Sequence, residues 1–295
     1  MIIRGGRMDE LNEQVEKLYL TNRISRVLAR VMVVLCVAAL LLAIWGKNPF
    51  GIILLVVSLG VLVVSRYIGC RYTQDAAAAN LRYGLAGSLE AFSYQASGGV
   101  ADREFRAWSL LPVEPAGRHL LSRNTFSGWE GALELAGSEI TFHYKTANGG
   151  RVGYRFLSGT LLTARTMVSH RHDEWLLLSE TLAKETEIQR FLEEEDYQPV
   201  EVPIRGCRLY AKEEQFLSGE DLSRLANVPE AVTALRLTNG GAAAYLNGRF
   251  YTGSHYPSAR PTPERLRENT LPQRDEVWSL FRWWLSPPNG DDCHL

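Results

Sequence analysis

The chain contains little cysteine. Its 295 residues include four cysteines, Cys36, Cys70, Cys207 and Cys293, and no two of them form a CxxC pair. A disulfide framework and a zinc knuckle both rely on closely spaced cysteines, so this spacing argues against either. The spacing agrees with a protein whose thiols face a reducing cytoplasm.

Neither sign of charge is in excess. The chain carries 32 lysines and arginines against 33 aspartates and glutamates, a formal net charge of −1. Nucleic-acid-binding domains commonly present a basic field, which this balance does not supply. We therefore expect no nucleic-acid partner.

Sequence signatures of catalysis are also missing. There is no HExxH, no G-x-S-x-G elbow, no P-loop and no GxGxxG, so we predict no cofactor and no catalytic residue. The densest group of potential metal ligands is His170-Arg171-His172-Asp173, and His143 lies on a neighbouring predicted strand. These histidines allow a metal-dependent site, although a polar loop between two strands explains the same residues.

What the chain does have is two long uncharged runs. Residues 31–46 and 48–65 carry no charge, and only Lys47 separates them. As helices, such runs rise about 24–27 Å, close to the ~30 Å hydrocarbon core of a bilayer. Asn48-Pro49 is a turn signal. We therefore predict two membrane-spanning helices joined by a short loop, with the lipid bilayer as one partner.

Flanking charges predict the orientation of these spans. The basic residues before the first run are Arg4, Arg7, Lys17, Arg23, Arg26 and Arg30, and those after the second are Arg66, Arg71 and Arg82. The connecting loop has Lys47 alone. By the positive-inside rule, both termini are cytoplasmic and the protein is a multi-pass protein of the cell (inner) membrane.

Around the spans, the sequence predicts five segments. They are an amphipathic N-terminal helix (1–26), the transmembrane hairpin (27–70), an Ala-rich stalk helix (71–99), a cytoplasmic domain (100–285) and a disordered tail (286–295). Whether the domain is one core or two subdomains, 100–196 and 197–285, stays open. Within the spans, Ala39/Ala43 and Ser65/Gly69 are small-xxx-small pairs, interpreted as facing lipid by chance, with pairing between protomers as the alternative.

Strands and helices are mixed in the cytoplasmic part. Hairpin signals occur at Asn148-Gly149, Asn239-Gly240 and Asn247-Gly248, and Ala136-Gly137 suggests a further turn. The predicted helices are Glu180 to Tyr197, a capped helix from Ser218 to Val228, and a last helix from Arg274 to Leu285. This mixture of mainly antiparallel strands with helices predicts an α+β fold.

Two of these helices carry features with more than one interpretation. Residues 193–196 are a run of four acids, either a solvated helix end or a patch for a cation or basic partner. On the last helix, Val277, Leu280, Phe281 and Trp284 share a face. We expect that face to pack on the sheet, with a membrane-interface contact as the alternative.

Four short segments resemble a known family. They are RAWSLLP (106–112), YRFLSGTLLTA (154–164), CRLYAKEEQ (207–215) and AAAYLNGRFYTG (242–253). In their order the chain resembles a bacterial "domain of unknown function" family of two-span membrane proteins with a large cytoplasmic C-terminal α+β domain. The resemblance implies the topology and the fold class, and it brings no catalytic residue.

Two functions therefore stand as hypotheses. The first is a membrane-anchored cytoplasmic interaction or ligand-sensing module without catalysis, with a protein partner at the cytoplasmic membrane face. The alternative is a membrane-proximal enzyme using the region of His143, His170 and His172. A homo-oligomer is compatible with either. Transport through the spans is weaker, because they contain no Asp, Glu or His.

Overall fold

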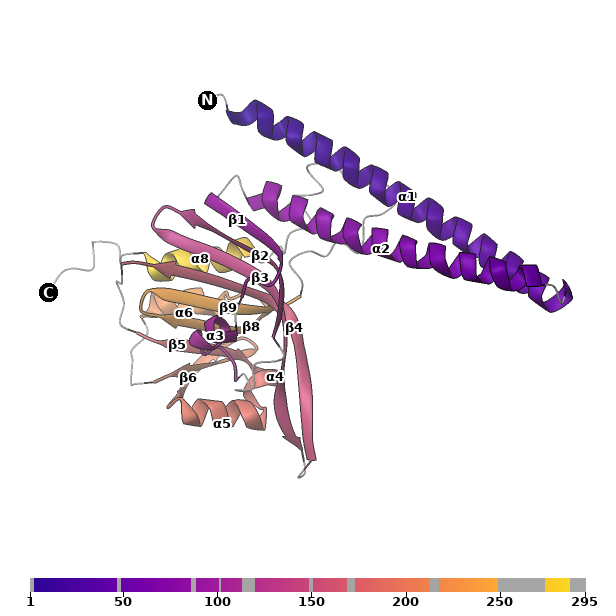
Figure 1. Cartoon of the computed structure of the whole chain (residues 1–295). Helices are drawn as coiled ribbons and strands as arrows, with labels where there is room; N and C mark the ends of the chain where they lie inside the picture. The colour runs from indigo at the N-terminus through magenta and orange to yellow at the C-terminus, as the bar shows by residue number, and fades with distance from the viewer. Residues whose placement is uncertain are drawn as a thin grey trace. The chain divides into compact units, whose positions relative to one another are not determined.

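The fold combines long helices with a large antiparallel sheet, and its class is α+β as predicted (Figure 1). The computed structural model describes residues 3–46, 49–85, 89–100, 102–112, 120–148, 151–168, 173–212, 218–248 and 274–286. The chain divides into two compact units. One comprises Met1–Gly84 with Gly253–Asn269, and the other Leu85–Thr252 with Thr270–Leu295.

The first unit contains two long helices, α1 (Ile3–Gly46) and α2 (Pro49–Leu85), which run side by side (Figure 1). The predicted N-terminal helix and first span form one uninterrupted helix. The Ser65 hydroxyl donates to the Ser25 carbonyl over 3.4 Å, and a Cβ on Gly69 would lie 3.6 Å from the Ser25 hydroxyl. Ser65 and Gly69 thus pack against α1 of the same chain, and the interpretation that they face lipid by chance is wrong.

The predicted stalk helix ends earlier than expected. Helix α2 stops at Leu85, and residues Glu90–Ser97 form strand β1, which pairs with β2 (Leu121–Glu130). The expected helix from 71 to 99 is therefore wrong over its last part. The Ala-rich composition favours helix locally, but hydrogen bonds to a neighbouring strand outweigh that preference.

The nine strands described in the second unit belong to a single sheet. Beyond β1 and β2 these are β3 (Leu133–Asn148), β4 (Arg151–Thr166), β5 (Trp175–Ser179), β6 (Gln198–Ile204), β7 (Cys207–Ala211), β8 (Val232–Thr238) and β9 (Gly241–Asn247). Their order is β1-β2-β3-β4-β9-β8-β5-β7-β6, and each neighbouring pair is antiparallel. Strand β5 lies between β8 and β7, so segments 100–196 and 197–285 share one core.

Two of the predicted hairpins are confirmed. The β3–β4 register pairs Asn148 with Arg151, and the β8–β9 register pairs Thr238 with Gly241. The continuation beyond Asn247-Gly248 lies outside the described residues. The turn expected at Ala136-Gly137 is wrong, because both residues lie within β3. The chain turns earlier, at Gly131, whose φ of 59° favours glycine.

Short helices cover both faces of the sheet. Helices α4 (Glu180–Ala183) and α5 (Thr186–Glu194) divide the predicted helix 180–197, and they share a buried cluster with α3 (Asp102–Ala107). In β5, Leu176 and Leu178 belong to that cluster, as the period of two in a strand requires. Helix α6 (Gly219–Ala226) begins with the predicted cap, a reciprocal Ser218–Asp221 capping box.

The last helix, α8 (Arg274–Leu285), contacts β4 and β9. Val277, Phe281 and Trp284 are almost completely buried. The indole nitrogen of Trp284 donates to the Thr238 carbonyl at 2.9 Å, which satisfies its polar atom inside the core. The predicted packing of this face on the sheet is confirmed.

Candidate functional site

The residues predicted for a metal site cannot be assembled from the described part of the chain. His143 has its backbone in β3, opposite Phe156, but its side chain lies outside the described residues, and so do His170 and His172. The described residues contain no group of three His, Cys, Asp or Glu side chains able to hold a metal ion. In the acidic run at the end of α5, Glu195 pairs with Lys212 of its own chain at 3.2 Å.

A polar pocket of about 380 Å³ lies in the sheet unit. The residues that form it come from four separate parts of the chain. Its lining includes Trp108 after α3, Arg165 at the end of β4, Glu174 before β5, Arg236 in β8, and Thr238 and Asn239 at the β8–β9 turn. Only the sheet order brings these segments together, since β4, β9, β8 and β5 are successive neighbours.

Arg236 lines the pocket and is held by two contacts of its guanidinium. Its Nη2 donates to Glu174 Oε1 at 2.7 Å, and its Nη1 donates to the Trp108 carbonyl. The side chain is only 10% exposed, so both contacts operate where water screens little. Arg236 is thereby held in one orientation, with the loop after α3 tied to the middle of the sheet.

The Oε1 atom of Glu174 has two further partners. The Tyr197 hydroxyl donates to Oε1 at 2.6 Å, and Lys212 Nζ lies 3.6 Å from it. Burial by itself raises the pKa of Glu174, but the hydrogen bond from Tyr197 and the charges of Arg236 and Lys212 outweigh it, and the pKa lies below its ordinary value. Burial, together with the bond to Glu174, raises the pKa of Tyr197.

This electrostatic pattern suits binding better than proton transfer. A general base works best when its pKa lies near the operating pH, and Glu174 is shifted the other way. Tyr197 keeps its proton at neutral pH because its pKa is raised. The pair therefore provides fixed charge and hydrogen bonds at neutral pH.

Arg165 forms the side wall of the pocket. Its guanidinium lies 4.9 Å from the centre of the Trp108 ring, a cation–π distance, and 3.7 Å from Glu104. The Arg165 and Glu104 side chains are each about half exposed, so this ion pair is weak and open to exchange with another anion. Asn239 adds an exposed amide at the rim.

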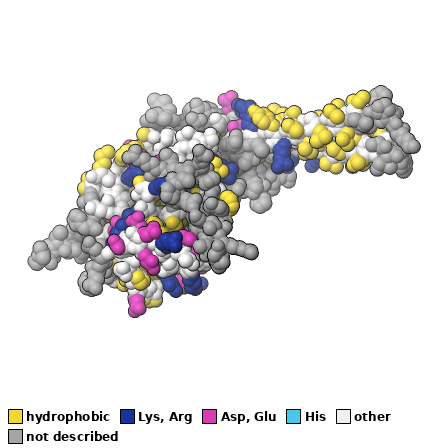
Figure 2. Space-filling model, turned by 60° about the horizontal axis from the view of Figure 1, so that its bottom comes forward, with side chains coloured by type: hydrophobic (Ala, Val, Ile, Leu, Met, Phe, Trp, Pro, Cys, Tyr) yellow, Lys and Arg dark blue, Asp and Glu magenta, His cyan; other side chains and the backbone are white. Residues whose placement is uncertain are grey.

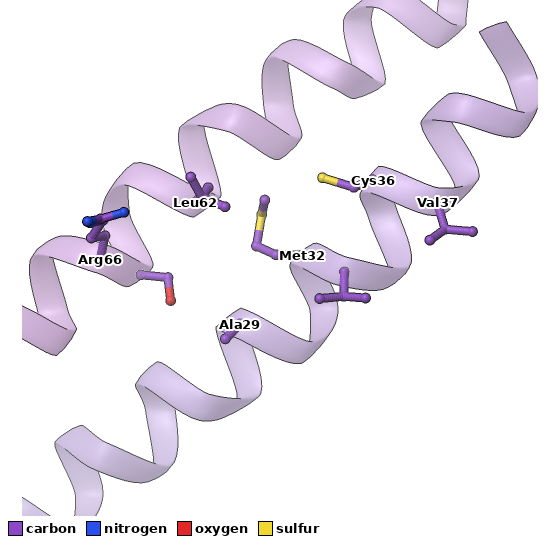
Figure 3. Close-up of a pocket in the computed structure, with 8 residues that line it drawn as sticks. Ala29, Met32, Cys36, Val37, Leu62 and Arg66 are labelled. Atoms are coloured by element: carbon purple, nitrogen blue, oxygen red, sulfur yellow. The ribbon is translucent and has the colours of Figure 1, made fainter. Parts of the chain in front are cut away.

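A second cavity of about 440 Å³ lies between α1 and α2. Its lining is apolar apart from Ser65 and Arg66 at one end. Figure 3 shows Met32 and Leu62 pointing into the gap from opposite helices, with Arg66 beside it on α2. Below, this cavity is called the interhelical groove.

Within the described residues, one helical stretch, Glu16–Leu42, is long and apolar enough to cross a membrane. The apolar stretch of α2, Ile53–Gly69, is shorter. Only 11% of the most apolar window of Glu16–Leu42 is buried, whereas the core helix of a soluble protein is mostly buried. The chain carries a helix that can serve as a membrane anchor.

Comparison with known proteins adds one distant likeness. No model of a protein family matches the chain, and no curated protein is similar to it. Among solved structures, it is similar to the mycobacterial trehalose monomycolate transport factor A, TtfA, with a TM-score of 0.42 and 10% identity, over 72% of this chain and 97% of that one. Function does not follow from a likeness this distant.

Sequence reasoning missed every residue of the polar pocket. One usable signal existed, an arginine inside the strand pattern TALRLT of β8, because a charged side chain between buried neighbours must find a partner. Its partner Glu174 precedes a different strand, so the pair becomes visible only when β8 and β5 are known to be neighbours.

Proposed function

We propose that this protein is a membrane-anchored interaction or ligand-sensing module. In this proposal, the α1–α2 hairpin spans the cell membrane twice, and the α+β unit lies on the cytoplasmic side. The observation that carries the proposal is the exposure of apolar side chains along both helices (Figure 2). Val34 of α1 is 67% exposed and Val63 of α2 is 64% exposed.

Water is a poor solvent for such a surface. Each apolar Å² left in water costs about 25 cal/mol, and monomeric soluble proteins rarely expose large continuous apolar patches. A bilayer removes this cost, and a helix satisfies its own backbone hydrogen bonds there. The uncharged part of α2, residues 49–65, has 17 residues, which rise about 25 Å as a helix, near the thickness of the hydrocarbon core.

The orientation is tested by thiol labelling. In full-length protein with Cys36, Cys70, Cys207 and Cys293 replaced by serine, Asn48→Cys and Gly290→Cys are each treated with an impermeant maleimide on intact cells. We expect labelling at position 48 from outside, and at position 290 only after permeabilisation. The reverse pattern would place the α+β unit outside the cytoplasm, and release of the protein by alkaline carbonate would end the proposal of an anchor.

The polar pocket beside Trp108 is the proposed binding place of the module. Its lining combines two guanidinium groups, a carboxylate, an amide and an aromatic ring, and the polar groups among these can hydrogen-bond a polar ligand. We expect benzoylphenylalanine at Asn239 to cross-link a discrete adduct in cells, and Arg165→Gln to reduce it. The matched control places the same amino acid at Glu230, which is 90% exposed and does not line the pocket. The same adduct at both positions would argue against the pocket.

A further inference from the structure

The interhelical groove differs from the rest of the α1–α2 surface, because it is a cavity with a charge at one end. From α1 it is lined by Ala29, Met32, Val33, Cys36 and Val37, which span nine residues, or about 12 Å along the helix. Leu62 of α2 faces them, and Arg66 lies one turn beyond Leu62. A slot of this kind fits part of an extended hydrocarbon chain.

The two helices are in close contact near the Arg66 end. Ser25 of α1 meets Ser65 through a hydrogen bond and lies opposite Gly69. These small residues let the backbones approach. Further along α1, the interhelical groove begins at Ala29 and Met32. The contact between Ser25 and Ser65 thus bounds the groove on one side, and the groove extends along the apolar part of α1.

Among the described residues that line the groove, Arg66 is the one that carries a charge. It follows the uncharged stretch 48–65, so in the proposed topology it lies at the level of the lipid headgroups. Its side chain is exposed, and among the described residues its guanidinium makes no recorded ion pair or hydrogen bond. Guanidinium groups bind phosphate oxygens through two parallel hydrogen bonds.

We propose that the interhelical groove binds one anionic membrane lipid. Its phosphate is held by Arg66, and one acyl chain lies in the slot between Met32 and Leu62. The charge of Arg66 and the apolar lining match the two halves of such a lipid. This inference rests on the proposed membrane anchoring. Beyond the general contact of the helices with the bilayer, it proposes one bound lipid that is selected by the charge of its headgroup.

Native mass spectrometry of the full-length protein in mild detergent tests the proposal. Phosphatidylglycerol and phosphatidylcholine with identical acyl chains are titrated separately, so that only the headgroup differs. We expect one phosphatidylglycerol to be retained with an apparent affinity about tenfold above that of phosphatidylcholine, the scale of one charge-assisted hydrogen-bond pair. Equal retention of the two lipids would overturn the proposal.

Matched variants separate the groove from the general surface. Arg66→Gln should abolish the preference for phosphatidylglycerol, and Arg66→Lys should restore part of it. Arg71→Gln, an exposed arginine on the same helix outside the lining, should leave it unchanged. Leu62→Trp fills the slot and should reduce retention of both lipids, whereas Val63→Trp, next to it but outside the lining, should not.

Three other outcomes would contradict the proposed lipid site or the membrane anchoring. An equal loss of preference in Arg71→Gln would show non-specific attraction to charge and overturn the site. A protein dimer that Leu62→Trp disrupts, without bound lipid, would show that the groove takes a second copy of the chain. Failure of the membrane anchoring itself appears separately, because the protein would then be released by alkaline carbonate whatever its lipid binding.

Discussion

Arg236 is an arginine placed where most strands carry an apolar side chain. Its neighbours in β8, Leu235 and Leu237, are each about 1% exposed. Moving an unpaired charge into such a place costs several kcal/mol, so the carboxylate of Glu174 and the carbonyl of Trp108 determine whether it is tolerated. The ion pair therefore holds the pocket in shape without adding much to overall stability.

Breaking this pair from one side should be costly. We expect Arg236→Met to lower the free energy of unfolding by about 3 kcal/mol. It leaves the Trp108 carbonyl without its donor, and it removes the closest cation of Glu174, which keeps Tyr197 and Lys212 as partners. Thermal or urea unfolding of the full-length protein in detergent, followed by near-UV circular dichroism, measures the change. The control is Arg205→Gln, whose side chain is 91% exposed and whose expected change is within about 0.5 kcal/mol.

A second substitution distinguishes charge from packing. Glu174→Gln added to Arg236→Met removes the carboxylate that has lost its closest cation, so the double variant should regain part of the lost stability. If the two changes simply add, the loss in Arg236→Met comes from packing and the ion pair is not responsible.

Glu174 should also make stability depend on pH. Its pKa in the folded protein lies below the ordinary value of 4.5, so its contribution is fully present above about pH 4.5. Below that, the unfolded chain binds the proton first, and the contribution is lost as the pH falls through the folded pKa. The midpoint of thermal unfolding should therefore fall less between pH 5 and about pH 3 in Glu174→Gln than in the wild type. Parallel curves would contradict the assignment.

At the scale of elements, the contact between β4 and β9 joins the two halves of the sheet. Gly159 in β4 pairs with Asn247, and a Cβ there would overlap the Leu246 carbonyl oxygen and lie 2.8 Å from the Tyr245 ring. No side chain fits at these distances without movement of the backbone. A glycine is required here for close approach of two strands.

Gly159→Ala should accordingly destabilise the sheet. We expect a loss of about 1–3 kcal/mol from overpacking, measured by urea unfolding. Gly219→Ala is the matched control, because nothing lies within 4 Å of its Cβ position and it begins helix α6. Alanine there favours helix, so stability should stay equal or rise by up to about 1 kcal/mol. Equal destabilisation by both would show that space at Gly159 is not limiting.

Short sequence patterns predicted the elements whose ends are determined by turn or capping geometry. Asn-Gly pairs located two hairpins, and the Ser218–Asp221 capping box located the start of α6. Strand β1 could not be predicted, because its residues EAFSYQAS follow an Ala-rich helix and become a strand only through pairing with β2. The sheet order and the polar pocket depend on the same long-range pairing, which no local pattern encodes.

At the scale of the whole molecule, the two units suggest where the chain can be divided. The domain bounds predicted from the sequence, 100–285, place the start of a free-standing fragment near Ala101. That fragment lacks β1, which pairs along β2 and brings Gly98 into contact with Ser122 and Thr125. The second compact unit begins at Leu85 instead.

A fragment of residues 85–295 should therefore be monomeric and unfold in one transition. A fragment of residues 101–295 exposes the outer edge of β2, and exposed strand edges promote aggregation. Size-exclusion chromatography and a thermal scan of the two fragments measure the difference. If both behave identically, β1 is dispensable, and the boundary taken from the sequence was adequate.

The separation of β4 from β9 along the chain has a consequence for synthesis. Strand β4 ends at Thr166, but its partner β9 starts only at Gly241. Ribosomes add about 5–20 residues per second, so the edge of β4 that pairs with β9 stays unpaired for on the order of 4–15 s. If the proposed spans enter the bilayer as they emerge, the unfinished sheet is tethered to the membrane during this interval. Tethering limits encounters between nascent chains, so anchoring the N-terminal part first would protect the slow closure of the sheet.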